Sequence, residues 1–82
     1  MKNYSVEVLS KESHGRYGKS YFFGMCVSAA NKKMAESFVE ELVDDMTFDE
    51  FLEWCVDDMK SVVKSVCYGE KPLCSFKAYV GC

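Results

Sequence analysis

Sulfur and imidazole groups are the side chains of this sequence best suited to chemistry. The 82 residues include five cysteines and one histidine, His14. Zinc sites usually draw two ligands from one tight Cys-x-x-Cys turn, and no two cysteines here have that spacing. His14 lies beside a glycine, with no evident group to orient it as the base for a cysteine nucleophile. We therefore expect no enzymatic activity, no metal site and no cofactor. We expect buried free thiols rather than disulfides at all five positions, which are Cys26, Cys55, Cys67, Cys74 and Cys82.

Acidic side chains form the second candidate group. Residues 34–59 hold ten acids and no lysine or arginine, so this segment carries −10 and the rest of the chain +7, within a net charge of −3. Many of the acids are four residues apart, where like charges on a helix cost a few tenths of a kcal/mol per pair. A solvated helix face is the simpler interpretation, but the helix dipole favours only two of the ten. We predict a binding surface for a basic partner, made of Glu40, Glu41, Asp44, Glu50, Glu53, Trp54, Asp57 and Asp58.

Trp54 is the aromatic member of this predicted surface. On a helical wheel it lies about 60° from the apolar stripe, among acidic residues. Tryptophan is enriched at interface hot spots, which makes Trp54 a candidate anchor. The alternative is that its ring folds under residues 10–18 and closes the core.

Basic residues outside the acidic segment suggest an alternative function, a small RNA- or DNA-binding regulator that uses a lysine-bearing sheet and loop face. The lysines are dispersed and no ribonucleoprotein motif is present, so nucleic acid is the less favoured partner. The residues of this alternative are Lys2, Lys11, Arg16, Lys19, Lys71 and Lys77, with Tyr17 and Tyr79. A third alternative is a thiol- or metal-based sensor that uses Cys67, Cys74 or Cys82.

Three strands are predicted to position these groups. Tyr4, Val6 and Val8 alternate with polar residues, as in a strand with one buried face. Residues 10–18 are polar and contain two glycines, which predicts a hairpin turn. Residues 21–28 are apolar on both faces, which predicts a strand at the centre of the sheet, and residues 74–80 alternate again.

Two amphipathic helices are predicted between the second and third strands. The first begins after Asn31, a good N-cap, and has its apolar residues at helical spacing up to Met46. The second begins at a capping box formed by Thr47 and Glu50 and continues without interruption to a stop at Gly69. The prediction is one α+β domain over residues 1–82 with the order β-β-α-α-β. Its three-stranded antiparallel sheet is packed on one face by the two helices.

Neither a signal peptide nor a membrane span is evident, because the uncharged stretch at residues 20–30 is too short to cross a bilayer. We therefore expect a cytoplasmic protein with no membrane partner. A homodimer through the sheet edge, supported by half-exposed Phe22, Tyr79 and Val80, stays an open alternative.

Two stretches carry a resemblance to a known family. Residues 24–30 (GMCVSAA), where a strand leads into a helix, and residues 51–55 (FLEWC), in an acidic helix, resemble parts of a type II-C anti-CRISPR family. That family binds the nuclease domain of an RNA-guided nuclease. The whole chain is also similar to small phage inhibitors of host defence and to phage antitoxins that neutralise an RNase toxin. The resemblance implies an inhibitor that occupies a basic site on a host nuclease or toxin, in the host cytoplasm, and it assigns no contact residue.

Overall fold

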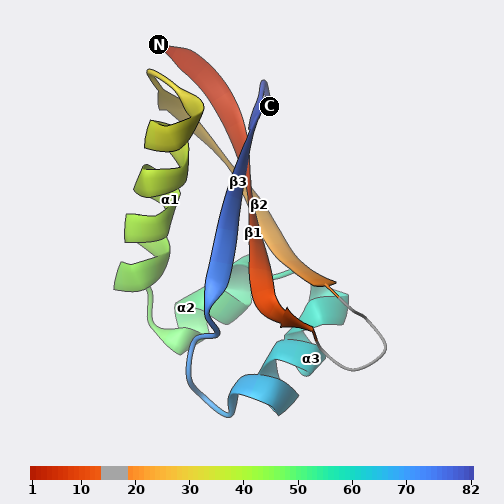
Figure 1. Cartoon of the computed structure of the whole chain (residues 1–82). Coiled ribbons are helices and arrows are strands. Elements are labelled where there is room, and N and C mark those ends of the chain that lie inside the picture. The colour runs from red at the N-terminus through yellow and green to blue at the C-terminus, as the bar shows by residue number, and fades with distance from the viewer. Residues whose placement is uncertain (14–18) are drawn as a thin grey trace.

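The computed structural model describes residues 1–13 and 19–82, which form one antiparallel sheet and three helices (Figure 1). The α+β class predicted from the sequence is confirmed. β1 extends to Ser13, so the first residues of the predicted turn at 10–18 belong to a strand, and residues 14–18 lie outside the described residues. The elements are β1 (Lys2–Ser13), β2 (Lys19–Ala29), α1 (Lys32–Asp45), α2 (Phe48–Trp54), α3 (Asp57–Cys67) and β3 (Cys74–Val80).

The strand order in the sheet is β2-β1-β3, so β1 is the central strand and β2 lies at an edge. The prediction that residues 21–28 form the central strand is wrong. Their apolar character on both faces has another cause. The pairing of β1 with β2 shifts register between Val8 and Leu9, next to Phe22. Phe22 is fully buried there, so the expectation that it is half-exposed and supports a homodimer is wrong. Helix α2 covers this end of β2, since the Phe51 ring packs edge-on against Phe22 and Phe23.

The core lies between one face of the sheet and the helices. Tyr4, Val6 and Val8 of β1 are buried on that face, and α1 adds buried side chains at four-residue spacing, Ala35, Val39 and Val43. Each large apolar side chain buried in this way contributes about 1.5–3 kcal/mol. On the opposite face of β2, Gly24, Cys26 and Ser28 are exposed. The helices therefore cover the sheet mainly from one side.

Local capping interactions begin the first two helices where the sequence predicts. The Asn31 side chain accepts a hydrogen bond from the Met34 amide at 2.9 Å. Thr47 and Glu50 form the predicted capping box, in which the Glu50 amide donates to the Thr47 hydroxyl at 3.2 Å. These bonds satisfy backbone N–H groups that otherwise have no hydrogen-bond partner at the start of a helix.

The predicted second helix is two helices, which is a correction to the sequence analysis. Cys55 and Val56 both adopt extended backbone angles between α2 and α3. The Val56 amide leaves the helical ladder and donates to the carbonyl of Phe22 in β2 at 3.1 Å. The helical periodicity continues across this break, and there is no glycine or proline to mark it. The break therefore follows from a tertiary hydrogen bond that the sequence pattern does not reveal.

Candidate functional site

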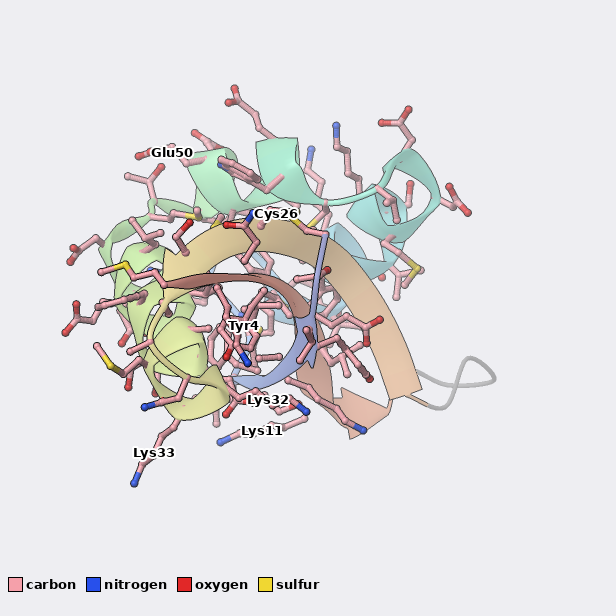
Figure 2. The ribbon with its side chains drawn as sticks, turned by 90° about the horizontal axis from the view of Figure 1, so that it is seen from above. Tyr4, Lys11, Cys26, Lys32, Lys33 and Glu50 are labelled. Atoms are coloured by element: carbon pink, nitrogen blue, oxygen red, sulfur yellow. A yellow bond between two sulfur atoms is a disulfide. The ribbon has the colours of Figure 1, made fainter. Side chains whose placement is uncertain are left out.

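The residues predicted to bind a basic partner are all exposed, and they lie on three helices instead of two. In Figure 2 the Glu50 side chain points away from the core. We call this set the acidic surface. It consists of Glu40, Glu41 and Asp44 on α1, Glu50, Glu53 and Trp54 on α2, and Asp57 and Asp58 on α3.

The break after Trp54 changes how the acids of α2 and α3 are related. Glu53 and Asp57 were expected to be neighbours on one helix face, but they belong to different helices. Glu53 and Trp54 stand at the end of α2, and Asp57 and Asp58 stand at the start of α3, after the break between the two helices. Asp57 and Asp58 occupy the first turn of α3, where the helix dipole stabilises negative charge.

Few of these carboxylates have a basic partner within the protein. Among the described side chains, those of residues 1–11 and 22–82, the one ion pair joins Asp57 to Lys60 at 3.3 Å, and the Lys60 side chain is 42% and that of Asp57 96% exposed. An exposed pair of this kind contributes at most about 1 kcal/mol. Glu50 has a structural role in the capping box. In the described structure, Glu40, Glu41, Asp44, Glu53 and Asp58 form no ion pair, so their charges face solvent.

Trp54 is partly packed and partly exposed. Its ring packs at a tilt against Phe23, with 6.0 Å between ring centroids, and half of the residue remains exposed. One part of the indole therefore stabilises the α2–β2 contact, and the other part is accessible beside the acids. The alternative that the Trp54 ring folds under residues 10–18 concerns a segment that lies largely outside the described residues.

Another acid outside the acidic surface, Glu36, has a structural role. Its carboxylate accepts a hydrogen bond from the Ala78 amide of β3 at 3.0 Å. This bond fixes α1 to the sheet and fills a backbone donor at the outer edge of β3.

The lysine-bearing alternative loses one of its members to a structural role. The Lys71 ammonium donates to the carbonyls of Val43 and Asp44, both at 2.7 Å, and so caps the C-terminal end of α1. Lys77 lies over the Tyr79 ring, 5.5 Å from its centroid, while Lys2 and Lys11 are exposed. Arg16 and Tyr17 lie outside the described residues, as does the side chain of Lys19. Four candidates of this alternative therefore remain on the described surface, namely Lys2, Lys11, Lys77 and Tyr79.

The cysteines differ from the sequence prediction. Cys26 and Cys82 are joined by a disulfide, with 5.9 Å between their Cα atoms, so the prediction of five free thiols is wrong. The hydrogen bond from the Gly81 amide to the Asn3 carbonyl brings the C-terminal end across to the sheet, where Cys26 is exposed. Only the pairing of β3 with β1 makes this proximity apparent, because the two cysteines are 56 residues apart.

The three remaining thiols are Cys55, Cys67 and Cys74. Burial raises the pKa of Cys55 to about 11 and the pKa of Cys74 to about 12. Burial therefore favours the protonated thiol over the reactive thiolate at both positions. In the described part of the chain, no group of three His, Cys, Asp or Glu side chains could hold a metal ion. His14, the base that a cysteine nucleophile would need, lies outside the described residues.

A small depression of about 180 Å³ lies between the end of α3 and the segment that leads into β3. Sequence reasoning did not find it, because it is formed by the path of the chain after the helix. Lys71 within it is already bonded to α1, so its ammonium serves the fold. The lining residues are Ser10, Val66, Cys67, Glu70, Lys71, Pro72 and Leu73.

No helix formed by residues 1–13 and 19–82 has the length and apolar character needed to cross a membrane. Comparisons of the chain with protein-family models, with curated proteins and with solved structures found no match.

Proposed function

We propose that this is a non-enzymatic binding protein of phage or mobile-element origin. It acts in the host cytoplasm, where it occupies a basic site on a host defence nuclease or toxin. The observation that carries the proposal is the acidic surface, whose exposed carboxylates lie on three helices beside a half-exposed tryptophan and mostly without basic partners.

The charge distribution supports a role in binding better than a role in stability. Carboxylates that repel one another without neutralising lysines lower the stability of the isolated fold by a few tenths of a kcal/mol per close pair. A partner rich in lysine and arginine removes that repulsion and forms charge-assisted hydrogen bonds with the same oxygens. Such a surface also accelerates the encounter with a basic partner.

Inhibition follows from competition for the same basic site. The site through which a nuclease binds phosphates is positively charged, and exposed carboxylates can occupy it in place of nucleic acid. The exposed half of Trp54 adds a rigid apolar contact at the junction of α2 and α3. In this mechanism the protein performs no chemistry of its own.

The test is a pull-down from bacterial host lysate with the tagged protein, washed at low and at high salt. We expect one stoichiometric protein partner whose retention weakens with salt. Asp58→Lys should reduce the measured affinity about tenfold, since it reverses a charge in the surface. The matched control is Glu70→Lys, which changes the net charge equally at an exposed position outside the acidic surface and should leave the affinity unchanged.

Charge variants are preferable to Trp54→Ala, because the contact of Trp54 with Phe23 makes that substitution a change of stability as well. Recovery of nucleic acid in place of a protein would contradict the proposal and favour the lysine-bearing alternative. Equal loss of affinity in Asp58→Lys and Glu70→Lys would show that net charge acts without a defined site.

A further inference from the structure

The outer edge of β2 presents backbone groups that are not used within the fold. The Ala78 amide bonds to Glu36 and therefore points away from β1. Val6, which lies opposite Ala78, then directs its backbone groups toward β2, where it pairs with Met25. Backbone groups alternate in direction along a strand, so those of Gly24, Cys26 and Ser28 point outward. In the described structure, no hydrogen bond reaches these outward groups.

The two edges of the sheet differ in how they are protected. The edge of β3 is covered at Ala78 by the Glu36 carboxylate, and the edge of β2 is covered at Phe22 by the Val56 amide. Between Gly24 and Ser28 there is no such cover. Edge strands are commonly protected by charged side chains, yet residues 20–30 carry no charge. This part of β2 is therefore open to pairing with another strand.

An apolar stripe on α1 lies on the β2 side of the molecule. Met34, Phe38 and Leu42 are spaced four residues apart and are 39%, 39% and 48% exposed. Successive residues turn by 100° on a helix, which places this stripe on the flank of α1 opposite Glu36. Since Glu36 reaches β3, the stripe faces the side where β2 forms the edge of the sheet.

The open edge and the stripe are centred at the same level. α1 runs back antiparallel to β2 after the connection at residues 30–31 (Figure 1). Cys26, the middle of the open edge, lies three residues before the end of β2, or about 10 Å. Phe38, the middle of the stripe, lies six residues after the start of α1, or about 9 Å. One two-fold axis at this level can therefore relate both features to those of a second molecule.

Opposite charges gather at the two ends of this side of the molecule, as an antiparallel two-fold pair requires. The end near the connection carries Lys2, Lys32 and Lys33, and Figure 2 shows Lys32 and Lys33 at the beginning of α1. The opposite end carries Asp44 and Asp45 at the end of α1, followed by the acids of α2. An antiparallel second copy would bring its basic end beside this acidic end, within about the 10 Å range of charge interactions in dilute salt.

We propose that β2 and α1 form a two-fold interface with a second copy of this chain. Gly24 pairs with Ser28 of the second copy, the two sheets join into one, and the stripes of the two α1 helices pack on each other about Phe38. A two-fold interface uses the same patch on both molecules, and this patch is complementary to itself in backbone pairing, apolar spacing and charge. It shares Asp44 of α1 with the acidic surface but lies apart from Asp57 and Asp58, and its argument does not use the proposed function.

The test is the mass in solution, measured by sedimentation equilibrium from about 1 μM to about 1 mM. We expect a reversible dimer with a Kd at or below about 100 μM. Phe38→Glu should give a monomer over the whole range. The matched control is Tyr79→Glu, since Tyr79 is 41% exposed on β3 and lies away from β2, and this variant should dimerise as the native chain does.

A charge exchange tests the antiparallel arrangement. Lys32→Glu combined with Lys33→Glu should raise the dimer Kd about tenfold, and adding Asp44→Lys and Asp45→Lys should restore it. The bond from Lys71 to Asp44 uses the main-chain carbonyl, so the reversal at Asp44 leaves that bond in place. A melting curve for each variant separates lost association from lost folding.

Three outcomes would overturn the proposal. These are a native chain that stays monomeric at about 1 mM, a dimer that persists in a folded Phe38→Glu variant, and a dimer that Tyr79→Glu disrupts. A covalent dimer, detected by its mass under denaturing conditions without reductant, would likewise assign the association to intermolecular disulfides.

Discussion

At Cys55 and Cys74, burial determines how the thiol reacts. Their pKa values are raised to about 11 and about 12, so little thiolate forms at pH 8. We expect iodoacetamide to label both cysteines at least about tenfold more slowly in the native protein than in urea. Site-resolved mass spectrometry measures the two rates. Equal rates in native and unfolded protein would mean that these thiols are not buried.

The same raised pKa values give stability a defined pH dependence. In the unfolded chain these thiols lose their protons near the ordinary value of 9.0, whereas the folded state retains them to about 11 or 12. The unfolded state therefore binds fewer protons above pH 9, and the free energy of unfolding falls as pH rises from 9 through the folded values. Urea unfolding at pH 8 and pH 10.5 measures this fall. Cys55→Ala should show a smaller fall than the native chain.

The end of α3 shows how a single element is terminated. Tyr68 takes the left-handed conformation with φ of 51°, and Gly69 follows with φ of 91°. A side chain at positive φ costs about 1–2 kcal/mol, and the Tyr68 side chain is mostly exposed, so few contacts compensate. We expect Tyr68→Gly to raise the free energy of unfolding by about 1 kcal/mol and Gly69→Ala to lower it by a similar amount. Urea unfolding of both variants is the measurement, and a stabilising Gly69→Ala would contradict the assigned backbone conformation.

On the scale of the whole molecule, the disulfide joins the C-terminal residue to the edge strand. A cross-link between residues 56 positions apart restricts the unfolded chain, and such bonds typically contribute about 2–4 kcal/mol. Reduction should lower the free energy of unfolding by about that amount. The control is a variant with Cys26→Ser and Cys82→Ser, whose stability should not respond to the reductant. Five free thiols in the unreduced native protein would show that the bond does not form.

This bond also bears on the proposed compartment. Disulfides are rare in the reducing cytosol, so we expect Cys26 and Cys82 to be thiols when the protein acts there. Rapid acid quenching of cells followed by thiol labelling measures their state. Complete oxidation in the host cytoplasm would contradict either the reducing environment or the proposed location.

The sequence by itself determined those features that depend on residues a few positions apart. The helix starts at Asn31 and Thr47 are confirmed, because each cap joins groups three residues apart. The exposure of the acidic surface was predictable for the same reason, since helical periodicity alone separates the apolar side from the charged side. Its role in binding stays a prediction.

Only the tertiary structure decided which distant segments meet. β1 is central because β3 pairs with it, and the helix breaks at Val56 because Phe22 supplies a carbonyl from β2. The disulfide of Cys26 with Cys82 depends on the same strand pairing. A backbone amide can satisfy its hydrogen bond in its own helix or across the fold, and packing of the whole chain selects between these partners. Local sequence patterns therefore predict the elements, whereas their breaks, order and cross-links follow from contacts between segments far apart in the chain.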